Sequence, residues 1–360
     1  MNICFYLASF TQGGIARSVS LIGDELAKNP DYHITALCHS SVEKEDIYKP
    51  GFEITYIYKR RTPVMNAMVK DHYVKKVAAY LKEKKIDLLI VCNELFAPAA
   101  IMAAKKIPLI YWFHTSPYVD TDFRFQKLSR RFALRRCDRV VTISETTKEV
   151  LSQKYRSDKI TRIYNMVDEK LFELNSAYDP DTMKIIAVGR LSYPKNYPSM
   201  IRIAASLREE MPKLQWHLYG DGDEREALEA LVKEYHLEDT FILKGQCSDL
   251  YSRYQDYSAI VLTSRYEGFP MVLLEAAACG LPMLSYDVLT GPSEIIENGE
   301  NGFLCPEGDE EEMKQRIIKL FEDRDLRLKM SENSRKTAQK LRGDSIVKQW
   351  EAVINDTVKK

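Results

Sequence analysis

The sequence contains no uninterrupted apolar run near the roughly 20 residues that a membrane-spanning helix needs. Its seven cysteines are odd in number and scattered, and none belongs to a Cys-x-x-Cys pair. We interpret them as small buried apolar side chains in a reduced compartment. The opening residues 1–6 lack the basic region and cleavage site of a signal peptide, and we expect them to form a first strand. A cytoplasmic protein is therefore predicted.

Net charge is also absent, because 52 Lys and Arg residues balance 52 Asp and Glu residues. The balance hides a split: residues 1–165 hold 27 Lys and Arg against 17 Asp and Glu, a charge of +10, and the remainder carries −10. The basic residues of the first part gather at 59–61, 75–76, 82–85 and 127–139. Any one cluster is ordinarily a solvated helix face. Together they favour contact with an anionic membrane surface, at about 1 kcal/mol for each basic residue near it. No nucleic-acid-binding motif occurs, so we expect no nucleic-acid partner.

Short apolar runs alternate with segments of helical period, which predicts parallel α/β architecture in two domains of ordinary size. The alternation restarts after Tyr164, so we place a first domain at 1–165 and a second at 166–340. A closing helix at 341–360, with Trp350 as its apolar anchor, is expected to pack back on the first domain. The predicted strands are 2–8, 33–38, 54–58, 87–91, 108–113 and 139–143, then 184–188, 215–219, 240–243, 259–262 and 283–285.

Open parallel sheets bind ligands beyond the carboxyl ends of their strands, and several motifs directly follow predicted strands. Gly13-Gly14 lies between the first strand and a helix, where the backbone can approach an anion closely and the helix start offers free N–H groups. For such a pair alone, a plain strand-to-helix turn is the better explanation. The Gly-x-Gly-x-x-Gly of dinucleotide binders is missing, which argues against nicotinamide binding.

Two basic residues, Arg190 and Lys195, follow Gly189 in the loop after the first strand of the second domain. A planar guanidinium and a compact ammonium at one strand end suit a diphosphate. A surface charge pair is the plainer explanation of these two residues alone.

Two glutamates flank a predicted helix start. Glu267-Gly268-Phe269-Pro270 follows a predicted strand, and Glu275 lies in the apolar run that comes next. Proline suits the first turn of a helix, so Met271 and Val272 would offer backbone N–H groups to a phosphate. Glu275 then lies roughly 7.5 Å along that helix, among apolar residues where an unpaired carboxylate is costly. A sugar, a diphosphate and a ribose in a row would satisfy this order of groups.

At these residues the sequence resembles glycosyltransferase family 4, whose signature has two glutamates spaced as Glu267 and Glu275 with Gly-Phe-Pro between them. The resemblance covers nearly the whole chain and is densest from 165 to 306. One such motif is weak evidence, whereas this many in sequence order is strong. The further motifs are Gly13-Gly14, His114, Asn165-x-Val167-Asp168, Gly189-Arg190, Lys195, Gly220-Asp221-Gly222, Cys279-Gly280-Leu281-Pro282 and Asn298-Gly299-x-Asn301-Gly302.

The resemblance implies an α/β fold of the GT-B type, two Rossmann-like domains facing each other across a cleft, and a metal-independent transfer with retention at the anomeric carbon. Arg190 and Lys195 would take the charge developing on the leaving diphosphate, which would itself act as the base. Glu267 and the amides of Gly268 to Pro270 would hold the donor sugar, and Glu275 the ribose. Gln246 and Ser248 would contact the nucleotide base. The other residues that would contact the donor are Gly13, Gly14, His114, Gly189, Phe269, Met271 and Val272.

Some sequence motifs imitate those of another transferase fold or differ from the family pattern. Asp221-Gly222-Asp223 imitates the Asp-x-Asp metal motif of the other large transferase fold, but it stands at the family's Gly-x-Gly loop, so we expect no metal and no cofactor. Ala16 stands where many members carry an acidic residue, and Gly291-Pro292 replaces a common Gly-Gly. These departures concern acceptor and donor-sugar detail.

The sequence thus predicts a glycosyltransferase that moves a hexose or N-acetylhexosamine from a nucleotide-sugar donor, UDP-linked, to a glycan or lipid-linked glycan acceptor. We expect it to act in cell-surface polysaccharide synthesis, as a peripheral protein at the inner face of the cell membrane. Two alternatives stay open. A catalytically silent partner of another transferase would be expected to lose Arg190, Lys195, Glu267 or Glu275, and none is lost. The other alternative is a GT-B epimerase or phosphorylase.

Overall fold

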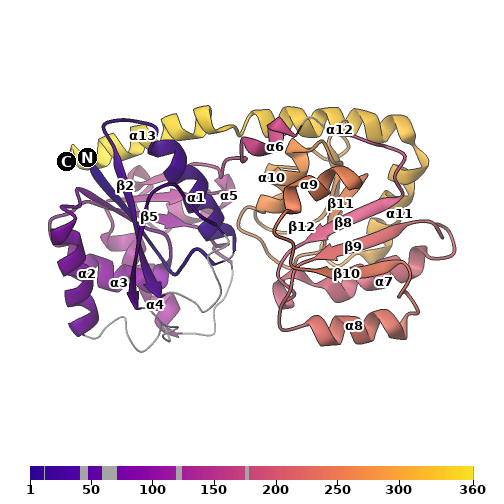
Figure 1. Cartoon of the computed structure of the whole chain (residues 1–360), viewed down its shortest axis with the longest axis horizontal. Helices are drawn as coiled ribbons and strands as arrows, with labels where there is room; N and C mark the ends of the chain where they lie inside the picture. Colours follow the sequence, from indigo (N-terminus) through magenta and orange to yellow (C-terminus); the bar gives the residue numbers. More distant parts are fainter. Residues whose placement is uncertain (12, 41–47, 59–70, 119–123, 175–177, 360) are drawn as a thin grey trace. The chain divides into compact units, whose positions relative to one another are not determined.

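The computed structural model describes residues 1–360 except 12, 41–47, 59–70, 119–123, 175–177 and 360. The predicted basic cluster at 59–61 lies outside the described residues. The chain divides into two compact units, one of residues 1–166 with 343–360 and the other of residues 167–342 (Figure 1). Among the described residues, no helix is both long enough and apolar enough to cross a membrane.

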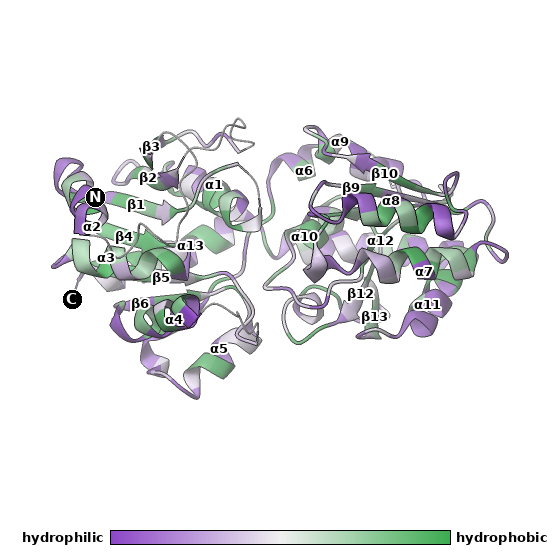
Figure 2. Cartoon of the chain, turned by 90° about the horizontal axis from the view of Figure 1, so that it is seen from below, coloured by the Kyte–Doolittle hydropathy of each residue, from purple (hydrophilic) through white to green (hydrophobic). Residues whose placement is uncertain are grey.

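Seven parallel strands form the sheet of the first unit, in the order β3-β2-β1-β4-β5-β6-β7. Helices cover both faces of the sheet, and its strands are accordingly apolar along much of their length (Figure 2). The strands are β1 (Asn2–Leu7), β2 (His33–Ser40), β3 (Glu53–Tyr58), β4 (Leu88–Val91), β5 (Leu109–Phe113), β6 (Arg139–Thr142) and β7 (Ile160–Arg162). The helices are α1 (Gly14–Leu26), α2 (Asp71–Glu83), α3 (Ala97–Ala104), α4 (Arg124–Arg136), α5 (Glu145–Ser152) and α13 (Gly343–Val358). The sequence did not predict β7, because three residues are too few to show a period.

The last helix, α13, packs on the first unit although the second unit precedes it in the chain. Trp350 is fully buried, and its ring centroid lies 4.6 Å from that of Trp112 at the edge-to-face angle of 68°. The Asn29 side chain donates to Glu351 at 2.7 Å. The end of the chain therefore contributes to the core of the first unit.

Six parallel strands form the second sheet, in the order β10-β9-β8-β11-β12-β13. The strands are β8 (Lys184–Val188), β9 (Gln215–Tyr219), β10 (Phe241–Gly245), β11 (Ala259–Leu262), β12 (Met283–Asp287) and β13 (Gly302–Pro306). The helices are α6 (Lys170–Glu173), α7 (Tyr197–Leu207), α8 (Arg225–Glu234), α9 (Leu250–Arg253), α10 (Met271–Ala278), α11 (Glu310–Glu322) and α12 (Arg324–Gln339). The sequence missed β13, whose glycine and proline ends are atypical of strands.

In each sheet the chain forms a central strand first, then adds strands on one side of it and afterwards on the other side. In the first unit this order reverses between β1 and β4, and in the second between β8 and β11. The loops after strands on either side of such a switch point diverge, and ligands bind there in doubly wound sheets. The loops that follow β1, β8 and β11 are therefore the places where each unit by itself can hold a ligand.

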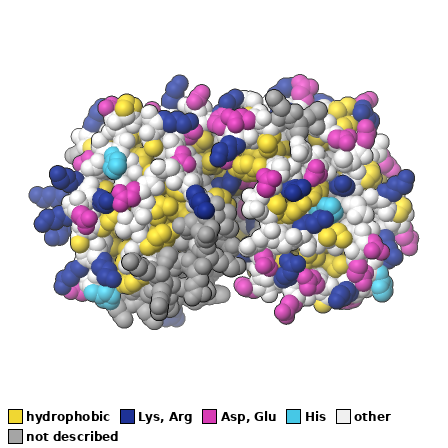
Figure 3. Space-filling model, viewed as in Figure 1, with side chains coloured by type: hydrophobic (Ala, Val, Ile, Leu, Met, Phe, Trp, Pro, Cys, Tyr) yellow, Lys and Arg dark blue, Asp and Glu magenta, His cyan; other side chains and the backbone are white. Residues whose placement is uncertain are grey.

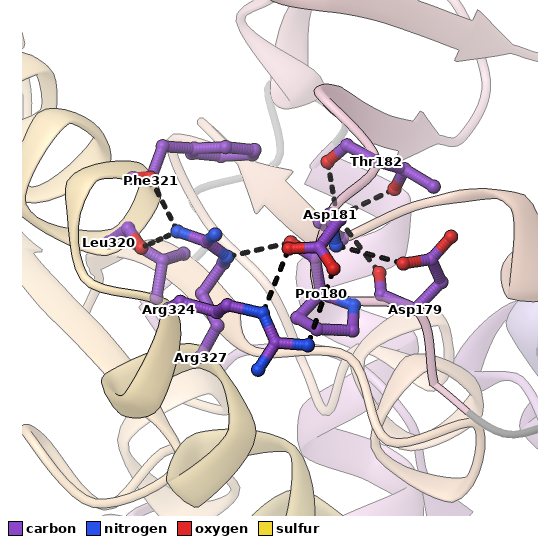
Figure 4. Close-up of polar contacts among 9 residues, drawn as sticks. Asp179, Pro180, Asp181, Thr182, Leu320, Phe321, Arg324 and Arg327 are labelled. Carbon is purple, nitrogen blue, oxygen red and sulfur yellow. Dashed lines mark hydrogen bonds and ion pairs between the residues drawn. The ribbon is translucent and has the colours of Figure 1, made fainter.

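Two arginines of α12 fasten the segment that leads into β8, as Figure 4 shows. The buried Arg327 donates to the carbonyl oxygen of Pro180 at 2.9 Å and to that of Leu320 at 2.7 Å. Arg324 donates to Asp181 at 3.0 Å. Because these contacts fix the entry to β8, they also fix where its carboxyl end and the following loop lie.

Candidate active site

The loops after β8 and β11 are joined by an ion pair. Lys195 Nζ lies 2.6 Å from Glu267 Oε1, and the two side chains are only 21% and 11% exposed. Ser264 Oγ donates to the same carboxylate oxygen at 2.7 Å. Thr263 Oγ1 donates to the carbonyl oxygen of Lys195 at 3.2 Å, which ties the backbones of the two loops together. The structure thus unites a cation and a carboxylate that lie 72 residues apart in sequence.

Arg190 is exposed on the same β8 loop as Lys195. The loop is held against the loop after β9, because Leu191 N donates to Asp221 O at 3.1 Å and Glu224 N donates to Leu191 O at 3.1 Å. The Asp221 side chain accepts a hydrogen bond from Gly222 N at 2.9 Å. In the part of the chain that the structure describes, no group of three His, Cys, Asp or Glu residues is arranged to hold a metal ion.

Gly291 supports the loop that carries Glu267. Its φ of +100° is one that other residues rarely adopt, and a Cβ there would lie 2.8 Å from Pro270 Cδ. The Thr290 hydroxyl also donates to the carbonyl oxygen of Glu267. Glycine is thus required at position 291 for the shape of this loop. Pro270 carries no N–H, so the prediction of an amide donor at that residue is wrong, and it stays a prediction for Gly268 and Phe269.

Helix α10 begins immediately after Pro270, which is extended at ψ 106°. Its first residue, Met271, is buried and Val272 is partly buried. Glu275, the fifth residue, is 5% exposed and accepts a hydrogen bond from Tyr254 Oη at 2.7 Å. The sequence placed Glu275 in a buried helix but did not reveal Tyr254, since nothing in a pattern links a tyrosine to a glutamate 21 positions later.

Gln246 and Ser248 are exposed and follow β10, an edge strand of the second sheet. Strand β10 lies two positions from β8 in that sheet. The two residues are accessible to a ligand at the same end of the sheet as Lys195, because parallel strands share their carboxyl edge.

The predicted residues of the first unit also follow strands. Gly13 precedes α1 with a φ of 103°, Gly14 is the first residue of that helix, and both are exposed. His114 comes directly after β5, and its ring centroid lies 4.3 Å from that of Trp112. Burial lowers the pKa of His114 to about 3. The imidazole is therefore neutral near pH 7 and can donate or accept a hydrogen bond.

Comparisons with known proteins agree with this architecture. The family model of the group 1 glycosyl transferases matches residues 170–337, and that of glycosyltransferase family 4 matches residues 12–171. An uncharacterized glycosyltransferase of Haemophilus influenzae is 28% identical over 293 residues, covering 80% of this chain and 82% of its own length. The amylovoran biosynthesis glycosyltransferase AmsD of Erwinia amylovora is 26% identical over 352 residues, covering 95% and 96%. The structure of Anabaena Alr3699/HepE in complex with UDP and glucose superposes with a TM-score of 0.82 at 21% identity, covering 98% and 99%.

Two Rossmann-like units that match such a structure over nearly their full length define a GT-B fold. The chain is a GT-B glycosyltransferase similar to glycosyltransferase family 4, since the family 4 model matches its first unit and the model of the group 1 glycosyl transferases matches its second. The predicted fold class and the family resemblance are confirmed. The roles expected of single residues stay predictions.

Proposed function

We propose that this glycosyltransferase moves a hexose or N-acetylhexosamine from a UDP-linked donor, with retention, to a glycan or lipid-linked glycan acceptor in cell-surface polysaccharide synthesis. The observation that carries the proposal is the Lys195–Glu267 pair next to the start of α10, with Glu275 inside that helix. The name of AmsD, which refers to amylovoran biosynthesis, supports the class of product. The UDP and glucose in the Anabaena structure support the class of donor.

The second unit offers positive potential for a leaving diphosphate. Lys195 and Arg190 follow β8, and the positive end of the α10 helix dipole favours an anion there. Negative charge grows on the diphosphate as its bond to the anomeric carbon breaks, so these groups stabilise the transition state more than the ground state. A phosphate oxygen of the leaving group then takes the proton of the acceptor hydroxyl. No protein base and no metal are needed for this step.

The two glutamates would bind different parts of the donor. Glu267 precedes α10 and would accept hydrogen bonds from sugar hydroxyls, whereas Glu275 lies about 6 Å beyond Met271 along the helix and would accept them from the ribose. Gln246 and Ser248 would contact the base. Gly13, Gly14 and His114 remain the predicted contribution of the first unit.

A screen of nucleotide sugars tests both the donor class and the absence of a metal. We expect UDP-sugars to be hydrolysed slowly without acceptor and to raise the unfolding temperature of the protein. The rate should be the same with and without excess chelator, because side chains and helix amides neutralise the diphosphate. A rate that collapses with chelator and returns with magnesium or manganese would instead make Asp221 and Asp223 candidate ligands.

We also propose that the first unit contacts an anionic membrane surface, as its charge of +10 suggests. Helix α4 holds six basic residues and no acidic one, and it exposes Leu128 by 63% and Phe132 by 38%. Not every basic residue of the predicted cluster at 127–139 is available to bind the membrane surface. Arg130 pairs with the buried Glu94 at 3.2 Å, and Arg139 pairs with Asp356. Figure 3 shows further Lys and Arg side chains at the outer edge of this unit.

Neutralising Arg124, Arg131 and Arg135 of α4 to glutamine should weaken binding to anionic vesicles. All three are exposed, and each basic residue near such a surface contributes about 1 kcal/mol. Vesicle sedimentation should show binding of the parent at low salt that fades as salt rises, since exposed charges are screened beyond about 8 Å at physiological ionic strength. Hydrolysis of a soluble donor should be unchanged.

The matched control removes three exposed lysines of the second unit, Lys213, Lys233 and Lys340. It changes the net charge by the same amount and should sediment with vesicles as the parent does. If the two triple variants bind anionic vesicles equally well, α4 is not the contact surface.

A further inference from the structure

A buried hydroxyl next to the candidate donor site has no hydrogen-bonding partner in the described part of the chain. Tyr197 is the first residue of α7 and is 1% exposed. Its Oη makes no hydrogen bond within the described residues. Because most buried polar side-chain atoms in native proteins are hydrogen-bonded, an exception at a ligand site requires an explanation.

Tyr197 and Lys195 border the same point in the β8 loop. A Cβ placed on Gly189 would lie 2.6 Å from Tyr197 Oη and 3.3 Å from Lys195 Cε. The Lys195 side chain continues from there to Glu267, 2.6 Å from its Nζ. The unpartnered hydroxyl therefore lies beside the side chain that neutralises Glu267.

The Tyr197 hydroxyl keeps its proton in these surroundings. Burial raises the pKa of this phenol, and the negative charges of Glu267 and Glu224 raise it further. A protonated hydroxyl next to two carboxylates is a hydrogen-bond donor that can be satisfied by either of them.

Glu267 Oε1 receives two hydrogen bonds in the free protein, from Lys195 and from Ser264. A bound diphosphate would compete for the ammonium of Lys195. A mostly buried carboxylate that loses its cation is left with a costly deficit of donors, and its orientation is then poorly defined.

We propose that Tyr197 is a positioning residue of the donor site, whose hydroxyl donates to Glu267 when Lys195 turns to the diphosphate. This inference rests on the proposed function and adds a residue to it. The hydroxyl stays unpaired in the free protein, and its hydrogen bond forms only with donor bound. Glu267 then keeps its orientation toward the sugar while its cation serves the leaving group.

The test is Tyr197→Phe, which removes one oxygen and leaves the ring in place. The unfolding temperature of the free protein should stay the same or rise, because a buried unpaired hydroxyl is lost. Turnover of the donor should fall about tenfold with a smaller change in KM, because Glu267 without this hydrogen bond no longer holds the donor sugar in its reactive orientation. The control is Tyr193→Phe, in the same loop but 63% exposed, which should behave as the parent.

Double variants identify the carboxylate through which Tyr197 acts. Glu224 is the competing acceptor, because its Oε2 is also buried without a hydrogen-bonding partner among the described residues. Tyr197→Phe should change turnover less than twofold in a Glu267→Ala background and about tenfold in a Glu224→Ala background. The reverse pattern would overturn the proposal, as would parental turnover in Tyr197→Phe. Failure of the parent to bind UDP or to turn over any nucleotide sugar would instead contradict the proposed function, and the inference with it.

Discussion

Lys195→Ala is expected to lower turnover of the nucleotide sugar roughly 100- to 1,000-fold, the loss typical of removing one donor to a developing negative charge. Arg190→Ala should lose activity to a similar degree. Both cations follow β8, and both contacts strengthen as the diphosphate leaves. Initial rates at saturating donor, with the unfolding temperature measured in parallel, separate a loss of chemistry from a loss of fold.

Lys213→Ala is the matched control for both variants, because Lys213 is an exposed lysine of the same unit. It should keep the parental rate. Lys195→Ala also removes the cation from Glu267, which is 11% exposed, so some loss of stability is expected there and not in Arg190→Ala. Near-parental turnover in a folded Lys195→Ala protein is incompatible with the diphosphate role.

Glu275→Gln should weaken the binding of UDP roughly 10- to 100-fold, the range expected for hydrogen bonds to a charged group. The side chain is 5% exposed inside α10, so water can replace the lost interactions only poorly. Its effect on the chemical step should be small, because the ribose is remote from the anomeric carbon. Glu267→Gln should do the opposite, with reduced turnover and nearly parental UDP affinity. Calorimetric titration with UDP measures the first effect, and initial rates measure the second.

Tyr254→Phe controls for the environment of Glu275. It removes the hydroxyl that donates to Glu275 at 2.7 Å and keeps the carboxylate, so UDP affinity should fall less than in Glu275→Gln. Equal losses of UDP affinity in Glu275→Gln and Glu267→Gln would contradict the proposed order of ribose and sugar along the helix.

The strands with the clearest apolar runs could be predicted to the residue, as at 184–188, 215–219 and 259–262, which are β8, β9 and β11. Short β7 and the glycine- and proline-bounded β13 could not, since their pairing depends on neighbouring strands rather than on their own pattern. The candidate site shows the same difference between residues recognisable from a local pattern and residues identified only by their contacts. Residues in local motifs, such as Gly268 and Glu275, were visible in sequence, whereas Tyr254 and Ser264 became part of the site only through contacts.

By itself the sequence determined the parallel α/β class, the succession of two Rossmann-like units and the family, because period and local motif are properties of neighbouring residues. Only the tertiary structure decided which charged and polar side chains are already paired within the protein and which can bind a ligand. It paired Lys195 with Glu267 and Arg130 of α4 with Glu94. It also buried the Tyr197 hydroxyl without a hydrogen-bonding partner among the residues that the structure describes. The physical reason is that an ion pair or an unpaired hydroxyl is a relation across sequence distance, and burial decides its energy. No local pattern records either one.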